Sequence, residues 1–394
     1  MMVDAAAAGR QSRSVASGAR SAHVRTDPDA ALVAYRNACT ASSASPSQDF
    51  GWIDAWARHV VPDFIVATLG PVEAPVFALA LEVVKSGPLK VARFMGERHA
   101  NGNFAPLSGI VAPSELDALF AAIHAARPDI DMLALERLAE TCGTATNPLL
   151  AFQNAPSANL ALAVSLEGGF EALLSRTSGK RKRKKHRSQQ RKFEAAGGFR
   201  RVEAKTPADV DALLDAFFVM KDERFRKLGI ANVFGRQDVQ SFFRALFAQA
   251  LAENPPAYVL HGLEVDGQIR AITGSSRTCD RLVCEFGSIS DDELASTSPG
   301  DFLFFENIRE ACEGGLSVYD FSVGDEPYKR LWCDLEIIQY DVLVPLTRRG
   351  ALLAHVMRAR NRITSFVKNS PLAWRLAKAL RRRRGQGSAP VAEE

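Results

Sequence analysis

The sequence predicts an α+β fold of two tandem lobes, each with a mixed, mainly antiparallel sheet flanked by helices. The chain has 394 residues, of which 47% are apolar and 24% charged, enough material for two hydrophobic cores. A meander of three strands followed by a helix and a further strand occurs twice along the chain. No strand leads into a GxGxxG turn, which argues against a doubly wound nucleotide-binding fold.

The first half of the chain gives the first meander. An aromatic-rich segment around Trp52 and Trp56 comes first. Three short apolar runs, separated by Gly-Pro pairs, follow at residues 64–69, 76–84 and 89–95. Pro113 then opens a predicted helix with the sequence PSELDALFAAIHAA, and a strand is expected at residues 131–135.

The second half repeats this order of elements. The periodicity of apolar residues predicts helices at 207–228 and 237–252, then strands at 257–265, 268–275 and 281–289. The Asp-Gly pair at 266–267 is the strongest hairpin signal in the chain. A Ser-Pro-Gly sequence at 298–300 opens a further helix, which ends at Gly-Gly 314–315, and a strand is expected at 316–322.

Composition along the chain predicts the domain boundaries. The repeat is one of element order, and the turn-rich residues 154–159 together with the start of a basic segment mark the division between lobes. The predicted parts are a disordered tail at 1–45, a first lobe at 46–165, a second lobe at 166–347, basic helices at 348–384 and a disordered tail at 385–394.

The net charge of +4 hides two basic segments. Residues 180–192 contain nine Lys or Arg and residues 348–384 contain twelve, in both cases without an acid, so local charge would attract phosphates, anionic lipid or nucleic acid. The first segment fits a solvated helix face, a nucleic-acid site or a docking site for acidic polysaccharide precursors or lipid. The second fits a helix on a membrane surface or one packed on the second lobe.

Several classes of protein are disfavoured. No window approaches 18 apolar residues, and the first thirty residues lack an apolar h-region, so the sequence predicts a cytoplasmic protein, with peripheral attachment to the inner face of the membrane as an option. Nucleic acid other than tRNA is not an expected partner, because no aromatic residue interrupts the first basic segment before Gln190. The six cysteines lack CxxC pairs and zinc spacing, which predicts reduced structural thiols and no metal site.

Two segments carry groups suited to chemistry. The Ser-Pro-Gly at 298–300 precedes a helix, whose N-terminal N–H groups and partial positive charge bind phosphate, although the same sequence also serves as a plain cap and turn. The segment YDFSVGDEPYKRLW, residues 319–332, crowds carboxylates, a phenol and a lysine around Gly324. These groups could relay a proton or hold an anionic substrate, or could form a solvated loop with surface ion pairs.

A resemblance to a known family extends over residues 50–345. The basic segment with its GGF, the helix DALLDAFFVMKDERFRKLG, SPGDFLFFENIREA, YDFSVGDEPYKRLW and the first-half stretch ARFMGERHANGNFAPL carry it. Together these stretches resemble the CelD-like, cellulose-biosynthesis-associated branch of the GNAT acyltransferases. That branch is itself similar to the Fem peptidoglycan aminoacyltransferases, which have two tandem GNAT-type lobes.

The resemblance implies acyl transfer from a CoA thioester, usually acetyl-CoA, to an amine or hydroxyl of a small-molecule or saccharide precursor of the cell envelope or an exopolysaccharide. It implies that the pantetheine arm lies where strands 281–289 and 316–322 separate, with the pyrophosphate near Ser298, Gly300 and Asp301. The usual Arg/Gln-x-x-Gly-x-Gly/Ala signature is absent. Two alternatives therefore stay open: a Fem-like transferase using aminoacyl-tRNA, and a non-catalytic accessory module of polysaccharide synthesis.

The transfer reaction needs a base but no covalent intermediate. The candidates for the base or a proton relay lie on or beside the proposed central strands: Glu285, Asp320 and Tyr328. An exposed position on an open sheet face is the alternative for Glu285.

Three further residues are candidates for substrate binding. Lys329 is expected to hold the acceptor or a phosphate. His99 and Asn101 lie on the apparent loop after the first meander, from which they could contact the acceptor across the lobe interface. A structural role for the histidine and a loop-shaping role for the asparagine are the alternatives.

Overall fold

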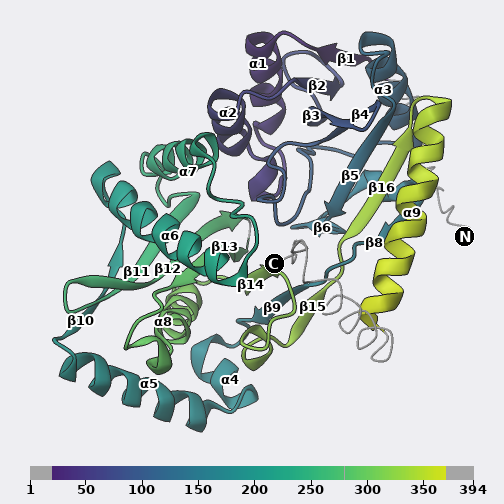
Figure 1. Ribbon diagram of the computed structural model, residues 1–394. Coiled ribbons are helices and arrows are strands. Elements are labelled where there is room, and N and C mark those ends of the chain that lie inside the picture. Colours follow the sequence, from purple (N-terminus) through teal and green to yellow (C-terminus); the bar gives the residue numbers. More distant parts are fainter. Residues whose placement is uncertain (1–19, 279, 370–394) are drawn as a thin grey trace, which may run out of the picture.

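The computed structural model describes residues 20–278 and 280–369, with side chains up to Ile363. Two seven-stranded sheets, each flanked by helices, form two lobes that lie side by side (Figure 1). Among the described strands, neighbours pair antiparallel in both sheets except for one parallel pair in each. This architecture confirms the predicted tandem α+β fold.

The first lobe contains the sheet with strand order β1-β2-β3-β4-β5-β16-β8. Its strands are β1 (Ala22–Arg25), β2 (Phe64–Leu69), β3 (Phe77–Ser86), β4 (Leu89–Phe94), β5 (Met132–Leu138), β16 (Tyr340–Pro345) and β8 (Asn154–Pro156). Its helices are α1 (Pro28–Cys39), α2 (Phe50–His59), α3 (Pro113–Ala126) and α9 (Arg348–Asn369), and β6 (Thr141–Cys142) pairs with β7 (Ala145–Thr146) in a small hairpin.

The second lobe contains the sheet with strand order β10-β11-β12-β13-β14-β9-β15. Its strands are β10 (Phe199–Glu203), β11 (Tyr258–Val265), β12 (Gln268–Thr278), β13 (Arg281–Ile289), β14 (Val318–Val323), β9 (Ala161–Ser165) and β15 (Leu335–Ile337). Its helices are α4 (Gly169–Arg176), α5 (Gly179–Ala195), α6 (Pro207–Leu228), α7 (Gln237–Ala250) and α8 (Pro299–Glu313).

Local sequence signals explain where several elements begin and end. At the start of α6 the Thr206 hydroxyl accepts a hydrogen bond from the Asp209 N–H, and the Asp209 carboxylate accepts one from the Thr206 N–H, which is a capping box. The helix ends at Gly229 in the left-handed conformation. Asp266 and Gly267 both have positive φ, as the tight turn between β11 and β12 requires.

The predicted disordered tail at 1–45 is wrong for the part of it that forms β1 and α1. Strand β1 pairs with β2, with Ala22 opposite Leu69, and so extends the first sheet. Helix α1 begins at a side-chain cap, because Asp27 accepts a hydrogen bond from the Ala30 N–H. Its buried Tyr35 donates to the Gln48 carbonyl. The first 19 residues lie outside the described part of the chain.

The predicted boundaries of the lobes also need correction, because two strands cross between them. Strand β9, placed at the end of the first lobe by the sequence, lies in the second sheet between β14 and β15. Strand β16, expected in the second lobe, pairs with β5 in the first sheet. Helix α9 packs on this first sheet, where Ala354 joins a buried cluster with Met132, rather than on the second lobe. The predicted helix beyond residue 369 and the tail at 385–394 lie outside the described residues.

One hydrophobic core runs through both lobes. Helix α2 lies against α7, and the rings of Trp52 and Trp56 each contact Phe242 edge-on with centroids 4.9 Å apart. Both tryptophans are fully buried, and aromatic side chains of this size contribute much of the apolar burial in a core. The lobes are therefore held together by packing as well as by the crossing strands.

The five described cysteines are not in disulfide bonds, and Cys279 is outside the described residues. Among the described helices, none has the length and apolar character to span a bilayer.

Candidate active site

Strands β13 and β14 separate in the middle of the second sheet. They pair in parallel over three positions, from Arg281 opposite Val318 to Val283 opposite Asp320, and their pairing ends there. On its other side β13 stays paired with β12 as far as Ile289. The strands thus part at the place where the sequence analysis expected a gap, with unpaired edges facing each other.

Glu285 is the extra residue of a β-bulge just beyond this point. In the ladder between β12 and β13, Ser275 lies opposite Cys284 and Gly274 lies opposite Phe286, so Glu285 has no partner on β12. Bulges of this kind redirect a side chain and often lie next to active sites. Gly274 makes room for the bulge, because a Cβ at this position would lie 2.2 Å from Cζ of Phe286.

The Glu285 carboxylate is held from both lobes. One oxygen accepts a hydrogen bond from the Ser276 hydroxyl at 2.5 Å, and the other accepts one from Nδ2 of Asn101 at 2.8 Å. The same Nδ2 donates to the Glu285 backbone carbonyl at 2.9 Å. Asn101 is fixed in turn, because Gln339 donates to its carbonyl at 2.7 Å. The structure therefore brings together two predicted site residues, Asn101 and Glu285, that lie 184 positions apart.

The environment of Glu285 adjusts its protonation. Burial raises the pKa of Glu285 to about 7, the hydrogen bonds from Ser276 and Asn101 act in the opposite direction, and the charge of Asp320 adds to the increase. The residue keeps intermediate exposure, which leaves an approach for a substrate. A carboxylate with a pKa near neutrality suits a general base at physiological pH.

Asp320 is a second carboxyl group at the point of separation. It is 8% exposed, and burial raises its pKa, while a hydrogen bond from the Ser322 N–H at 2.7 Å and the nearby Arg281 lower it. The Arg281 guanidinium lies 3.6 Å from the carboxylate. Asp320 thus occupies the predicted strand, with its charge partly balanced, and its role as a proton relay stays a prediction.

Tyr328 and Lys329 follow β14, with Tyr328 just before the short turn Lys329–Leu331 and Lys329 as the first residue of this turn. Lys329 is 5% exposed, and its ammonium donates to the Val323 carbonyl at 2.8 Å and pairs with Glu326 at 2.9 Å. These contacts close the end of β14, so the amine is occupied by its own chain. Tyr328 is 45% exposed, and its ring stacks on Phe304 of α8 with centroids 5.8 Å apart.

The start of α8 lies against the end of β13. Ser298 has a left-handed backbone conformation, and Gln189 of α5 donates to its carbonyl at 3.0 Å. A Cβ at Gly300 would lie 2.8 Å from a methyl group of Ile289, which shows how closely helix and strand approach. The first intrahelical bond runs from the Phe302 N–H to the Ser298 carbonyl, so the N–H groups before it form the free end of the helix.

The negative charge of Asp301 at this helix start is offset by neighbouring side chains. Its carboxylate pairs with the Lys185 ammonium at 2.9 Å and accepts a hydrogen bond from the Trp332 indole at 3.2 Å. A bound phosphate at this end would therefore contact backbone N–H groups rather than the Asp301 side chain.

His99 lies inside the aromatic core shared by the lobes. It is 7% exposed, with ring centroids 4.9 Å from Phe234 and 5.3 Å from Phe243. Burial is the main cause that lowers the pKa of His99 to about 4, so the ring is neutral at physiological pH. The geometry gives His99 a packing role, and Asn101, two residues later, is the member of this loop that reaches the separated strands.

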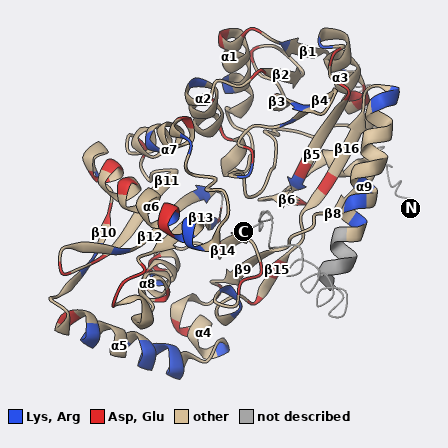
Figure 2. Cartoon of the chain, in the orientation of Figure 1, with Lys and Arg blue, Asp and Glu red and all other residues tan. Residues whose placement is uncertain are grey.

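The basic segment at 180–192 forms helix α5, which packs on α8. The His186 ring lies between Phe302 and Phe305, with centroids 4.5 Å and 4.0 Å away, and its Nε2 is 2.7 Å from the Glu306 carboxylate. The opposite side of α5 is exposed to solvent and basic (Figure 2). A row of cations at three- and four-residue spacing runs along it: Lys180, Lys184, Arg187 and Arg191.

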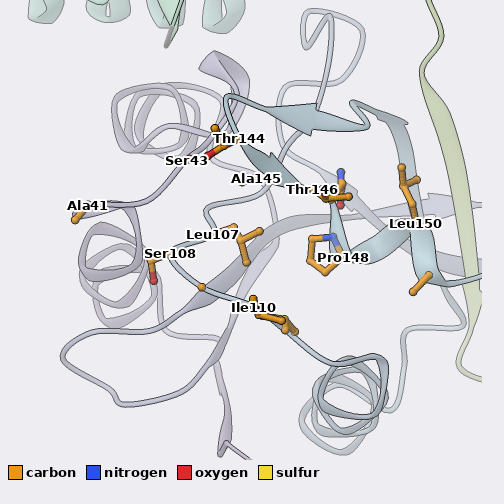
Figure 3. Close-up of a pocket in the computed structure, with 14 residues that line it drawn as sticks. Ala41, Ser43, Leu107, Ser108, Ile110, Thr144, Ala145, Thr146, Pro148 and Leu150 are labelled. Atoms are coloured by element: carbon orange, nitrogen blue, oxygen red, sulfur yellow. The ribbon is translucent and has the colours of Figure 1, made fainter. Parts of the chain in front are cut away.

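Two cavities lie away from the separated strands. One of about 820 Å³ lies in the first lobe and is lined by polar and apolar side chains that include Ser43, Ile110 and Thr146 (Figure 3). Another of about 550 Å³ lies beyond the C-terminal end of α8, next to Gly168 and Gly315. Neither is lined by Glu285 or by the start of α8, so the site is defined by the strand geometry and its polar groups.

Comparisons with known proteins bear on the fold of the chain. Residues 180–330 match the family model described as the acetyltransferase (GNAT) domain. The crystal structure of FemX superposes with a TM-score of 0.54 at 10% identity, covering 82% of this chain and 97% of that one. No curated protein matches the chain.

Two further solved structures are similar over most of the chain. The C-terminal domain (DUF2156) of a putative lysylphosphatidylglycerol synthetase from Agrobacterium fabrum has a TM-score of 0.48 at 12% identity, covering 84% of this chain and 95% of its own. A tandem GNAT protein from the clavulanic acid biosynthesis pathway has a TM-score of 0.43 at 12% identity, covering 82% and 98%.

The fold and the family match define the class of protein. The chain has a two-lobed GNAT-type fold, with two mainly antiparallel sheets flanked by helices. More particularly, the residues that match the GNAT domain model include β13, α8 and β14, the elements that form the candidate active site.

Proposed function

We propose that the protein transfers an acyl group from an acyl-CoA thioester to an amine or hydroxyl, with Glu285 as the general base. The observation that carries this proposal is the partly buried carboxylate on a bulge at the point where β13 and β14 separate. Its raised pKa and its hydrogen bonds from both lobes match the needs of a base that works near neutral pH.

In this mechanism the thioester lies between the separated strands, next to Glu285. The acceptor nitrogen or oxygen attacks the thioester carbon, and the proton that it loses passes to the Glu285 carboxylate. Backbone N–H groups on the unpaired edge of β13 stabilise the developing oxyanion. The carbon–sulfur bond then breaks, the new carbon–nitrogen or carbon–oxygen bond remains, and the proton passes to the CoA thiolate.

The start of α8 suits the pyrophosphate of such a donor. It offers backbone N–H groups at a helix N-terminus, and the Lys185 ammonium offsets the negative charge of Asp301 there. Replacing Gly300 with Leu would push the new side chain into Ile289. We expect this variant to lose acetyl-CoA binding while keeping its circular dichroism spectrum, and unchanged affinity would contradict the proposed position of the donor.

For the acceptor we propose a cell-envelope or exopolysaccharide precursor, the substrate class that the resemblance to the CelD-like branch implies. The exposed row of cations on α5 supports an anionic acceptor or an anionic membrane surface that presents it. Under this proposal the protein works at the inner face of the membrane.

The test is a thiol-release assay with acetyl-CoA against a panel of amino sugars, nucleotide sugars and polyamines. We expect acceptor-dependent release that is lost in Glu285→Gln and kept in Glu73→Gln, which changes an exposed glutamate in the loop between β2 and β3. Absence of both acetyl-CoA binding and thiol release across the panel would contradict the proposal.

A second candidate is a transferase that uses aminoacyl-tRNA as donor. The exposed cations of α5 favour it, because four of them form one row along the side of this helix that faces solvent. Saturable binding of aminoacyl-tRNA without saturable binding of acetyl-CoA would support this donor. A non-catalytic accessory module, which the missing pyrophosphate signature favours, would bind neither donor productively and would release no thiol.

A further inference from the structure

Three metal-binding side chains meet at the edge of the second sheet, away from the separated strands. They are Glu203 at the end of β10, His261 on β11 and Glu310 in the last part of α8. One ligand atom of each lies within 4.8 Å of the others. The sheet register explains the first contact, because Glu203 lies directly opposite His261. Helix α8 lies against β11 and supplies the third group.

His261 has an unusual environment for a histidine. It is 1% exposed, and neither ring nitrogen has a hydrogen-bond partner. Its Nε2 lies 3.8 Å from Oε2 of Glu310, which is beyond hydrogen-bond distance. Buried polar side chains nearly always have a partner, so an unpartnered imidazole with one nitrogen near a carboxylate oxygen indicates a missing ligand.

The geometry suits a small cation. For three atoms at most 4.8 Å apart, a point between them lies no more than about 2.8 Å from each, and zinc binds nitrogen and carboxylate oxygen at roughly 2.0–2.2 Å. Movements of the three ligand atoms by less than about 1 Å would therefore bring them within bonding distance of a zinc ion. Glu203 lies at the end of the edge strand β10 and is partly exposed, so an ion can enter from solvent.

Two guanidinium groups, those of Arg201 and Arg277, act on His261 and oppose a cation. Arg201 donates to Asn307 at 2.9 Å and to Oε2 of Glu310, the same oxygen that lies 3.8 Å from Nε2 of His261. A carboxylate oxygen has two lone pairs, so Oε2 can accept from Arg201 and still face an ion. The charges of the two carboxylates balance those of the two guanidiniums, so the ion is held by its bonds to the imidazole and the carboxylates rather than by an excess of negative charge.

We propose that Glu203, His261 and Glu310 bind one divalent transition-metal ion, with Zn²⁺ as the preferred occupant. A set of one imidazole and two carboxylates is typical of such ions, whereas Ca²⁺ and Mg²⁺ take oxygen ligands. The ion links the C-terminal part of α8 to β10 and β11. It lies near the end of α8 opposite to Gly300, so this proposal is independent of the proposed acyl transfer.

The experiment measures zinc in the full-length protein without an affinity tag. After treatment with a chelator and dialysis, the protein is titrated with ZnCl₂, and bound metal is counted by mass spectrometry of the eluted protein. We expect one tightly bound ion per chain and a rise in melting temperature on adding zinc. Glu203→Gln and His261→Asn should each raise the dissociation constant for zinc at least about tenfold.

Glu313→Gln is the matched control, because this glutamate is exposed and follows Glu310 by three residues on the same helix. It should bind zinc as the unaltered chain does. Because Glu203 is partly exposed at the end of an edge strand, its replacement leaves the core intact even where the His261 variant fails to fold. Absence of saturable zinc binding, or an unchanged dissociation constant in Glu203→Gln, would overturn the proposal.

Discussion

At the scale of single residues, Glu285 shows how position alters the chemistry of a carboxylate. Its ordinary pKa of 4.5 would leave it a weak base, but burial raises the value to about 7. The protonated form therefore prevails below pH 7 and the ionised, proton-accepting form above it. The catalytic competence of the site should follow this ionisation.

The first prediction concerns this pH dependence. With a hydroxyl or weakly basic amine as acceptor, kcat/KM should rise about tenfold per pH unit below pH 7 and level off above it. Glu285→Gln should lose this dependence and reduce kcat/KM by roughly a hundredfold to ten-thousandfold. Steady-state kinetics between pH 5.5 and 9 measure both effects, and a rising limb with the same midpoint in the variant would assign the base to another group.

Asn101 is the residue through which the first lobe acts on this carboxylate. Its hydrogen bond to Glu285 lowers the pKa of the carboxyl group, so Asn101→Ala should move the rising limb of the pH profile to higher pH. Activity on the high-pH plateau should fall less than activity at pH 7. Asn37→Ala, which changes a partly exposed asparagine on helix α1 of the first lobe, is the control that should leave the profile unchanged. A uniform loss at every pH in Asn101→Ala would indicate a merely structural role.

The sequence identified Glu285 as a candidate base, but it did not predict the bulge or the hydrogen-bond partners around this residue. A glutamate on a central strand was identifiable, whereas the bulge that redirects it depends on the ladder with β12. The partners Asn101 and Ser276 come from separate parts of the chain. The Glu203, His261 and Glu310 cluster has no short spacing that a sequence motif could reveal.

At the scale of elements, the contact between α5 and α8 shapes the helix start that would receive the donor. His186 stacks between two phenylalanines of α8, and Gln189 donates to the carbonyls of Thr297 and Ser298. A helix that looks like a solvated basic segment in sequence is thus anchored along one side. This anchor keeps the turn before α8 in place.

We expect His186→Ala to lower the free energy of unfolding by about 2 kcal/mol, because it removes ring packing and the hydrogen bond to Glu306. Urea denaturation followed by circular dichroism measures the change. Arg187→Ala, the exposed neighbour, should stay within about 0.5 kcal/mol of the unaltered chain. Equal stability of the two variants would show that α5 is not anchored as described.

The bulge on β13 is a second feature of this scale. Gly274→Ala should displace the Phe286 ring, shift Glu285 and reduce kcat/KM by about tenfold or more, since small displacements of a catalytic group are costly. Adding Phe286→Leu removes the clash and should restore part of the activity. Kinetics of the single and double variants provide the comparison, and an undiminished kcat/KM in Gly274→Ala would separate the bulge from catalysis.

Elements with strong local signals were predicted well, and those that depend on distant partners were not. Helix α6 spans the residues expected from its apolar spacing and caps, and the Asp-Gly turn joins β11 and β12 as predicted. Strands β9 and β16 were assigned to the wrong lobes, because the choice of neighbour in a sheet is set by packing between distant segments. The short β1 was missed for the same reason.

At the scale of the whole molecule, neither lobe is complete in one continuous stretch of chain. The first sheet needs β16 from near residue 340, and the second needs β9 from near residue 161. The shared aromatic core adds a further link through α2 and α7. The two lobes should therefore unfold together.

This arrangement predicts the effect of truncation. A chain that ends at residue 338 lacks β16 and α9, exposes the edge of β5, and should melt at a lower temperature or become insoluble. A chain that ends at residue 369 keeps both elements and is the control. Differential scanning calorimetry compares them, and equal melting temperatures would show that β16 contributes little to the first lobe.

The late return of β16 also bears on how the chain is made in the cell. The ribosome must release the chain through residue 345 before β5 gains its last neighbour, because residues 340–345 are synthesised some two hundred positions after β5. Until then the nascent first half carries an open strand edge that can pair with other chains. The first sheet therefore stays incomplete during this interval, and chaperones that shield hydrogen-bonding edges would have their strongest effect on yield while residues 139–345 are synthesised.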